Sequence, residues 1–341
     1  MAKVPRSRVI TWSPSVTLVP THQCFNACGY CNFRQPLGSS AAPAGSDWLG
    51  DQQALGQLER RPEAFEVLLL SGEVAPTAPN RRAWFERLQQ LSRLALAKGR
   101  LPHTNAGPLT RAEMAALGRL NPSMGMMLEG LGPAYDTAHR HAPSKTLARR
   151  LGQLEQAGRL GIPFTTGLLL GLGESAQQRI EALELLAVLQ RQWGHIQEVI
   201  LQPWRPAAPV PGEPADSLTL GEVDDLLATI AAARQILPRE VHLQLPPNLW
   251  PLEQLLRAIE AGIDDLGGID CSDVINSDWP QPRPADLADL LAQACWQLRP
   301  RLCVHPGWIA ALPSRLRQSA AICQTRLLAS APSAMGCPVR S

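Results

Sequence analysis

The sequence predicts an α/β protein that folds as a (β/α)8 barrel of the TIM type, closed or nearly closed, with a helical extension at its C-terminal end. Short apolar runs rich in strand-forming residues alternate with longer segments whose apolar residues recur at helical spacing. Alternation of this kind is typical of βα units around a parallel sheet. The runs number eight, as in a TIM barrel, and loops rich in glycine and in the chain's 31 prolines separate them.

The elements follow in order from this pattern. The predicted strands are residues 16–20, 66–70, 101–105, 123–128, 164–170, 198–202, 242–245 and 265–269. The clearest helices are residues 81–98, 144–160, 176–193, 220–236 and 252–261. Proline and glycine mark loops at residues 38–45, 203–214 and 280–284. Beyond these the pattern is helical, most clearly over residues 286–297. We therefore expect a barrel domain over residues 1–284 and a C-terminal helical extension and tail over residues 285–341.

Composition limits the class of protein. A chain of 341 residues that is 45% hydrophobic and 18% charged is expected to be globular with a sizeable core. Its net charge of +2 favours neither nucleic acid nor a membrane surface as a partner, so we expect small-molecule partners. No apolar run approaches the length of a spanning helix, and the first 15 residues lack the apolar centre of a secretion signal. We expect a cytoplasmic protein, whose eight cysteines stay reduced.

Three cysteines dominate the chemistry that the sequence suggests. Cys24, Cys28 and Cys31 follow the first predicted strand with C-x3-C-x2-C spacing. Thiolates are the ligands of iron–sulfur clusters, and a four-iron cluster held by three of them keeps one iron open for another ligand. The alternatives are a group of buried thiols and a zinc site, and zinc usually takes four protein ligands that include C-x2-C pairs. We favour a [4Fe-4S] cluster, and we expect the scattered later cysteines to be unremarkable buried thiols.

Two glycine-containing segments follow predicted strands. In Ser71-Gly72-Glu73 the glycine allows close backbone approach, and the carboxylate can accept hydrogen bonds from an ammonium group. The segment over residues 167–174 places glycines at the end of the fifth strand, before a helix whose first backbone N–H groups are free. An ordinary strand-to-helix turn is the alternative in both places.

Other polar residues stand where predicted strands end or in the loops that follow. A polar residue in such a place can bind a ligand or cap a helix. In the loop after the fourth strand, Arg140 is suited to a carboxylate, and His139 or His141 to proton transfer near neutral pH. A solvated charged loop is the alternative there. The strand-end residues are Asn105, Glu129, Gln202 and Asn248.

The cysteine spacing, with an aromatic residue (Tyr30) before the third cysteine, resembles the signature of the radical S-adenosylmethionine (SAM) enzymes. That superfamily places its cysteine loop after the first barrel strand. The resemblance implies that SAM chelates the open iron and that its cleavage releases a 5′-deoxyadenosyl radical. Ser71-Gly72-Glu73 resembles a Gly-Gly-Glu segment that binds the methionine amino group, with Ser71 at the first glycine. Residues 167–174 resemble a G-x-I-x-G-x-x-E pattern that supports adenine and ribose, with Leu169 at the isoleucine.

Longer segments of the sequence narrow the resemblance to one family within that superfamily. Over roughly residues 13–282 the chain is similar to the CofG-type family of 7,8-didemethyl-8-hydroxy-5-deazariboflavin synthases. The family resemblance implies that a CofH-type partner joins the hydroxybenzyl group of tyrosine to a ribityl-diaminouracil, and that hydrogen abstraction from the adduct, ring closure, ammonia release and oxidation give the deazaflavin Fo, precursor of coenzyme F420. A flavodoxin or ferredoxin is the expected electron donor. The segments are PTHQCFNACGYCNFR, LPHTNAG, SMGMMLEG, HRHAPSK, PFTTGLLLGLGES, LQPWRP and LQLPPNLWP.

The resemblance and the strand-end positions together assign the site. Cys24, Cys28 and Cys31 are the expected cluster ligands. The expected cofactor-binding residues are Tyr30, Ser71, Gly72, Glu73, Asn105, Glu129, Arg140, Gly167, Gly171, Glu174 and Gln202. The candidates for acid–base chemistry, on position only, are Glu129, His139, His141 and Asp270. Hydrogen bonds to the uracil and ribityl groups are expected from Gln202, Asn248 and Asp273.

Two alternatives remain at this point. Another barrel-type radical SAM enzyme, such as the CofH partner, a menaquinone-pathway cyclase or a biotin-synthase relative, would share the cluster and SAM. A non-catalytic iron–sulfur protein would share the cluster alone.

Overall fold

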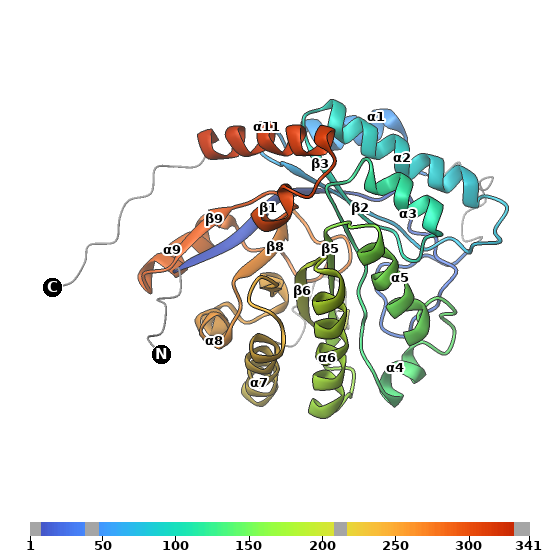
Figure 1. The fold of residues 1–341 in the computed structure, drawn as a ribbon. Helices are drawn as coiled ribbons and strands as arrows, with labels where there is room; N and C mark the ends of the chain where they lie inside the picture. Colours follow the sequence, from blue (N-terminus) through green and yellow to red (C-terminus); the bar gives the residue numbers. More distant parts are fainter. Residues whose placement is uncertain (1–7, 38–47, 208–216, 331–341) are drawn as a thin grey trace.

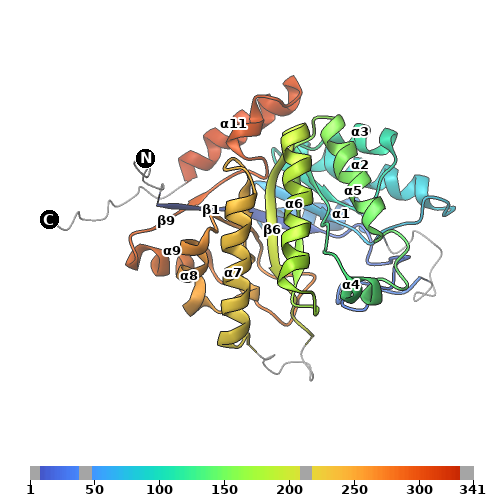
Figure 2. The same ribbon diagram turned by 60° about the horizontal axis from the view of Figure 1, so that its bottom comes forward.

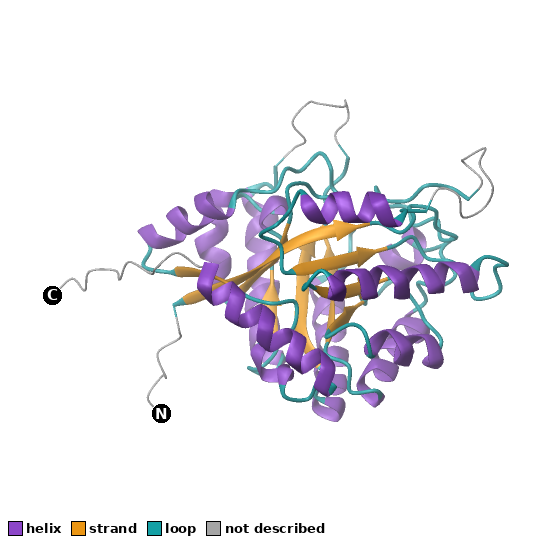
Figure 3. Ribbon diagram, turned by 90° about the horizontal axis from the view of Figure 1, so that it is seen from above, coloured by secondary structure: helices purple, strands orange, loops and turns teal. Residues whose placement is uncertain are grey.

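The computed structural model describes residues 8–37, 48–207 and 217–330, and it shows a closed barrel of parallel strands (Figure 1). Consecutive strands pair in parallel, and β1 pairs with both β2 and β8, which closes the ring. Figure 3 shows the strands at the centre with helices around them. The predicted (β/α)8 architecture is confirmed. The eight strands are β1 (Val9–Leu18), β2 (Glu66–Leu70), β3 (Leu101–Asn105), β4 (Ser123–Gly125), β5 (Phe164–Leu170), β6 (Ile196–Pro203), β7 (His242–Gln244) and β8 (Asp265–Ile269).

Helices cover the outside of this barrel. Several begin where a side chain caps the first turn: Thr110, Ser175 and Thr219 each accept a hydrogen bond from the backbone N–H three residues later. Buried residues such as Trp84 and Leu88 turn the apolar face of α2 toward the strands. The helices are α1 (Asp51–Glu59), α2 (Arg81–Ala97), α3 (Arg111–Gly118), α4 (Pro133–Ala138), α5 (Leu147–Arg159), α6 (Ala176–Trp193), α7 (Leu220–Ile236) and α8 (Leu255–Ala261), with short 3-10 turns η1 (Pro247–Leu249) and η2 (Leu252–Gln254) before α8.

Most predicted bounds agree with the structure, and the exceptions have physical causes. Strands β2, β3, β5 and β8 and helices α6 and α7 have the predicted limits. Strand β4 ends at Gly125 rather than residue 128, although the Met126 N–H still donates to the Thr165 carbonyl of β5 at 3.0 Å. Strand β1 begins earlier than predicted, at Val9, because its first residues pair with a ninth strand that the sequence analysis did not predict. The predicted loops at residues 38–45 and 203–214 lie wholly or partly outside the described residues.

The chain after residue 284 folds against the base of the barrel. It contains α9 (Pro284–Gln293), β9 (Gln297–Pro300), α10 (Pro306–Ile309) and α11 (Ser314–Ser330). The predicted helix over residues 286–297 was too long: Cys295 has a φ of 58°, outside helical values, and Gln297 begins β9 beside β1. Helix α11 packs on Phe65 and Leu101, and Figure 2 shows it along one side of the barrel. The domain boundary at residue 284 stays a prediction.

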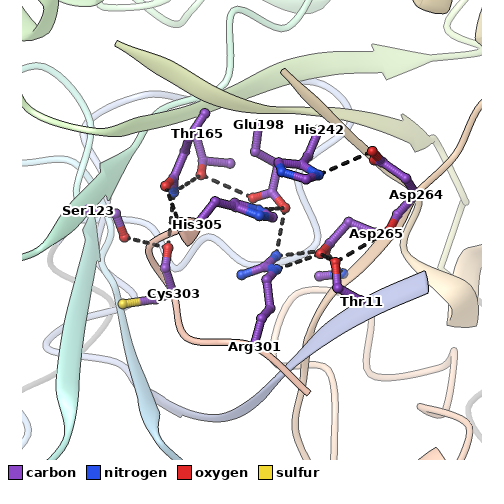
Figure 4. A network of polar contacts seen from close by, with 12 residues as sticks. Thr11, Ser123, Thr165, Glu198, His242, Asp264, Asp265, Arg301, Cys303 and His305 are labelled. Carbon is purple, nitrogen blue, oxygen red and sulfur yellow. Dashed lines mark hydrogen bonds and ion pairs between the residues drawn. The ribbon is translucent and has the colours of Figure 1, made fainter. Parts of the chain in front are cut away.

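A buried charge network lies inside the barrel at the N-terminal ends of the strands (Figure 4). Arg301, which follows β9, donates two hydrogen bonds to Asp265 of β8 and one to Glu198 of β6, the latter at 2.6 Å. The carbonyl of Cys303 accepts hydrogen bonds from Ser123 of β4 at 2.8 Å and from Gln197 of β6 at 3.0 Å. Residues 301–305 thus enter the barrel from below and form its floor.

Within the described residues, no helix combines the length and the apolar character needed to cross a membrane.

Replacement of Arg301 by methionine is expected to lower the free energy of unfolding by about 3–5 kcal/mol, because Glu198 and Asp265 would stay buried without their counter-charge. Urea denaturation followed by circular dichroism measures the change. Arg299→Ala is the matched control: Arg299 is exposed on β9, and within the described residues its side chain bonds the neighbouring Gln297 alone, so its loss should cost less than about 0.5 kcal/mol. Equal effects of the two variants would contradict a floor held by Arg301.

Candidate active site

The C-terminal ends of the strands surround a cavity that we call the thiol chamber. The loop after β1 carries all three clustered cysteines into its wall. Several predicted site residues meet there, from the ends of four other strands and from the cysteine loop. They are Cys24, Cys28, Cys31, Tyr30, Ser71, Gly72, Glu73, Asn105, Glu129 and Gln202.

Neighbouring segments hold the cysteine loop by backbone hydrogen bonds. The N–H groups of Ala27 and Gly29 donate to the carbonyls of His141 and Ala138, at 2.7 and 2.8 Å. The N–H of Phe25 donates to the Glu73 carbonyl at 3.0 Å. A loop outside the sheet has no ladder of its own, so these contacts satisfy its polar backbone. They also fix the thiols relative to the ends of β2 and β4.

Gly72 is required for this docking. A Cβ atom at this position would lie 2.1 Å from the carbonyl oxygen of Gln23 in the cysteine loop, well inside contact distance. The Gly72 N–H donates to the Thr21 carbonyl at 2.8 Å, and the next N–H, that of Glu73, points at the Cys24 sulfur at 3.3 Å. The glycine therefore lets the β2 loop pack directly under the cysteine backbone.

The three thiols are partly buried in the chamber wall, and thiolates are the soft ligands that an iron–sulfur cluster takes. Burial raises the pKa of Cys28 to about 11, and burial with the Glu73 charge raises that of Cys24. Iron binding to these thiols would therefore release protons.

Four charged residues lie beside the thiols, three of them buried and one, Lys145, partly buried. Glu73 accepts a hydrogen bond from Arg150 at 2.8 Å, Glu129 accepts a short one from Lys145, and the two pairs lie within 4.0 Å of each other. Burial opposes ionisation of both carboxyl groups, but the two cations outweigh it and hold both pKa values below the ordinary range. The Nε of Arg150 is buried and has no acceptor among the described residues.

The backbone of Glu129 is strained into this position. Its φ is 78°, a left-handed value that favours glycine. Strand β5 holds it there, since the Glu129 N–H donates to the Gly167 carbonyl at 3.1 Å and the Leu169 N–H donates to the Glu129 carbonyl at 2.8 Å. A strained backbone of this kind persists where surrounding contacts hold it in place, and such residues often lie at functional sites.

Four polar or charged residues that bond Glu73 or Glu129 were not predicted from the sequence. Asn26 and Ser144 both bond the Glu73 carboxylate, and Lys145 and Arg150 supply the positive charge. Ser144 and Lys145 belong to the HRHAPSK segment, so the family resemblance of that segment could have pointed to them. Arg150 lies inside the amphipathic α5, where sequence alone does not distinguish it from a surface arginine.

Three predicted residues of the loop after β4 stand apart from the chamber. Arg140 and His141 are exposed and do not line it. His139 is half-buried behind Tyr30, whose hydroxyl lies 3.0 Å from its Nε2. Burial lowers the pKa of His139 to about 4, so the imidazole is neutral at pH 7. His139 therefore lies where it can hold the Tyr30 side chain in position.

The glycine-rich end of β5 acts on the site indirectly. Gly167 faces β6, where a Cβ atom would lie 2.3 Å from the Ile200 carbonyl oxygen, so it permits close strand pairing. The Glu174 carboxylate accepts hydrogen bonds from the backbone N–H of Gly171 at 2.8 Å and from the side chain of Arg179. None of these residues lines the thiol chamber; Leu169, between them, does.

A second cavity, the inner chamber, continues from the first into the barrel. The two share Asn105 and Gln202, and the inner chamber extends from Asn248 and Asp273 at the mouth to Arg301 at the floor. TIM barrels usually fill this space with layers of side chains. Here Gly125 and Gly268 line it and contribute no side chain. The barrel is therefore hollow beside the thiols.

Asp270, at the end of β8, also borders the inner chamber. Its carboxylate accepts hydrogen bonds from the backbone N–H groups of Thr17 at 2.7 Å and Cys271 at 2.6 Å, and it pairs with Arg61. The Asp270 carboxylate is therefore occupied by hydrogen bonds and an ion pair within the protein.

Comparison with known families defines the class. Residues 18–186 match the radical SAM superfamily, and the chain is a radical SAM enzyme. The FeFe-hydrogenase maturase HydG from Carboxydothermus hydrogenoformans has the same fold with a TM-score of 0.66, at 15% identity over 94% of this chain and 78% of that chain. Methylornithine synthase (PylB) has a TM-score of 0.60 at 14% identity, over 85% and 84%. At such identities these structures support the fold alone.

Sequence relatives define the family within that class. The chain is 50% identical over 316 residues to the 7,8-didemethyl-8-hydroxy-5-deazariboflavin synthase of Synechococcus elongatus, covering 92% of this chain and 91% of that protein. The synthase of Thermosynechococcus vestitus is 50% identical over 315 residues, covering 91% and 97%. The chain belongs to the 7,8-didemethyl-8-hydroxy-5-deazariboflavin synthase family.

Gly72→Ala is expected to displace the cysteine loop, because the added methyl group would meet the Gln23 carbonyl oxygen. Iron content per chain after anaerobic reconstitution should fall to less than about half, while the circular dichroism spectrum stays native, since a surface loop carries little core packing. Gly152→Ala is the control, because a Cβ there meets nothing within 4 Å and alanine favours the helix. Full iron loading of the Gly72 variant would contradict the docking argument.

Proposed function

We propose that this chain is the radical SAM lyase that completes the deazaflavin Fo. Its substrate is the adduct 5-amino-5-(4-hydroxybenzyl)-6-(D-ribitylimino)-5,6-dihydrouracil, and the reaction closes the central ring with release of ammonia. One observation carries the proposal: identity of 50% over 92% of the chain to a synthase of that name. Three thiols and a buried charge cluster in one chamber support it.

The donor set fits the cofactors of the superfamily, a [4Fe-4S] cluster and SAM. Cys24, Cys28 and Cys31 would hold the cluster and leave one iron for SAM. When bound, these groups supply a 5′-deoxyadenosyl radical that abstracts hydrogen from the adduct. Tyr30 offers an aromatic face to the adenosine.

The buried charges suit the methionine end of SAM. Glu73 would accept hydrogen bonds from its ammonium group, and Arg150, with Lys145, would pair with its carboxylate. The unpartnered Nε of Arg150 leaves a donor for such an anion. This assignment replaces Arg140, which is exposed outside the chamber. Asn105, Gln202 and the strained Glu129, which line the same chamber, would contact the ribose and its surroundings.

Protonation states restrict the acid–base roles. Lys145 and Arg150 keep Glu129 ionised, so it would accept a proton rather than donate one. His139 is neutral and holds the Tyr30 hydroxyl, and His141 lies outside the chamber. Glu129 stays the candidate proton acceptor near the thiols on its position in the chamber wall, and its lowered pKa makes it a weak base.

The expected partners follow from the reaction. A CofH-type subunit would supply the adduct, and a flavodoxin or ferredoxin would supply electrons. The near-neutral chain offers no charge excess for nucleic acid or a membrane surface. A cytoplasmic location, where thiols stay reduced, remains our expectation.

The reconstituted protein is expected to convert the adduct, SAM and a reductant into fluorescent Fo and 5′-deoxyadenosine under anaerobic conditions. Dethiobiotin or a menaquinone-pathway precursor should yield neither a deazaflavin nor turnover. Cys28→Ala should abolish both products while leaving the barrel folded, since the cluster would lose a ligand. Cys295→Ala, which removes an exposed thiol beyond α9, is the control and should retain activity. Deoxyadenosine from the Cys28 variant would contradict its role as a ligand.

A second experiment separates the two arginines. Arg150→Gln is expected to raise the KM for SAM by about 10- to 100-fold, the loss of a charge-assisted hydrogen bond. Arg140→Gln should change it less than twofold, because Arg140 is exposed away from the chamber.

Initial rates of 5′-deoxyadenosine formation across SAM concentrations give both KM values. Circular dichroism checks that the Arg150 variant is folded, since it also leaves Glu73 with one fewer partner. A larger effect at Arg140 than at Arg150 would restore the assignment made from the sequence.

A further inference from the structure

The floor of the inner chamber presents a histidine in a defined tautomer. Ser123 donates its single hydroxyl proton to the Cys303 carbonyl at 2.8 Å. His103 Nδ1 lies 2.7 Å from the same hydroxyl oxygen, so the imidazole must be the donor in that contact. His103 therefore carries its proton on Nδ1. Its Nε2 holds a lone pair, and no donor to it is found in the described part of the chain.

That lone pair borders the open space of the barrel. His103 lines the inner chamber. The neighbouring strand leaves room for the ring, since a Cβ atom at Gly125 would lie 2.8 Å from Nε2. Burial, reinforced by the Arg301 charge, lowers the pKa of His103 to about 3, so the ring stays neutral and Nε2 stays an acceptor at pH 7.

The mouth of the chamber presents a second acceptor. The amide nitrogen of Asn248 donates to the Asp273 carboxylate at 2.9 Å and to the Trp279 carbonyl at 3.1 Å, which fixes the orientation of the amide. Its Oδ1 is buried and has no donor within the described residues, and the residue is 9% exposed. Asp273 also accepts hydrogen bonds from the backbone of Ile275 and Asn276, so it acts as the anchor of Asn248.

The two chambers differ in aromatic content. Tyr30, Phe33 and Trp204 line the thiol chamber. No phenylalanine, tyrosine or tryptophan of the described chain lines the inner chamber, whose floor instead carries Glu66 and Glu198 beside Arg301. Planar rings stack favourably on aromatic side chains. A hydroxylated chain needs hydrogen-bond partners along its length, which the inner chamber offers.

We propose that the inner chamber binds the polyhydroxylated chain of the substrate, with His103 Nε2 at the floor and Asn248 Oδ1 at the mouth accepting hydrogen bonds from its hydroxyl groups. The inference rests on the proposed function for the identity of that chain, the D-ribityl group. It places the ring portion of the adduct toward the thiol chamber, where hydrogen abstraction takes place, and it makes His103 and Asn248 determinants of specificity for the ribityl group.

The test measures binding without turnover. Anaerobically reconstituted protein is titrated, without SAM or reductant, with two fluorescent ligands, Fo and its analogue that carries a methyl group in place of the ribityl chain, and fluorescence anisotropy gives each Kd. Wild-type protein should bind Fo at least about 10-fold more tightly than the analogue. Equal affinities would overturn the proposal.

Variants locate the contacts. His103→Phe keeps a ring of similar shape and removes the acceptor, so Fo binding should weaken by about 10-fold while analogue binding is unchanged. Asn248→Ala should act in the same direction at the mouth. His195→Phe removes a buried histidine that lines neither chamber, and it should bind both ligands as the wild type does.

Two outcomes for these variants would overturn the proposal. One is Fo binding that stays unchanged in both His103→Phe and Asn248→Ala. The other is an equal loss of both ligands in folded protein, because the contacts would then not concern the ribityl group. Since the assay needs no catalysis, failure to form Fo from the adduct would count against the proposed function alone.

Discussion

The buried guanidinium of Arg301 makes a hollow barrel possible. A TIM barrel ordinarily gains stability by filling its interior with branched apolar side chains. Here acidic residues point inward from β6 and β8, and burial of those charges is tolerated because Arg301 pairs with Glu198 and Asp265. The base of the barrel is thus closed by polar contacts with the C-terminal segment, and the space above it stays open for a ligand.

At the other end of the barrel, close backbone contact replaces side-chain packing. The cysteine loop has little regular structure, and its position depends on hydrogen bonds to the loops after β2 and β4. Gly72 permits one of these contacts because it has no Cβ. Glu73 and Glu129 then extend from the same two strand ends toward the thiols. The thiols and the carboxylates are therefore positioned by the same few segments.

The strands and helices that depend on nearby residues could be predicted from the sequence. Strands such as β2 and β5 are short apolar runs with clear turn signals on both sides, and their predicted limits agree with the structure. The features that could not be predicted depend on contacts between residues far apart in the chain. Strand β9 exists because it pairs with Val9–Trp12, almost 290 residues earlier in the chain. Among the cations, Arg140 was preferred because it lies in a polar loop, while Arg150 occupies the buried face of a helix, which only the assembled barrel identifies as the wall of a cavity.

The charge balance of the thiol chamber explains how it can exist before any ligand binds. Glu73 and Glu129 carry two negative charges, and Lys145 and Arg150 carry two positive ones, all within contact of one another. A zwitterionic ligand, such as the methionine end of SAM, adds one charge of each sign, so it can exchange partners with these groups without leaving a buried charge unpaired. A chamber with only carboxylates, or only arginines, would pay the full desolvation cost of its own charges in the empty state. Preformed neutral pairs avoid that cost and keep the donors and acceptors oriented for the ligand.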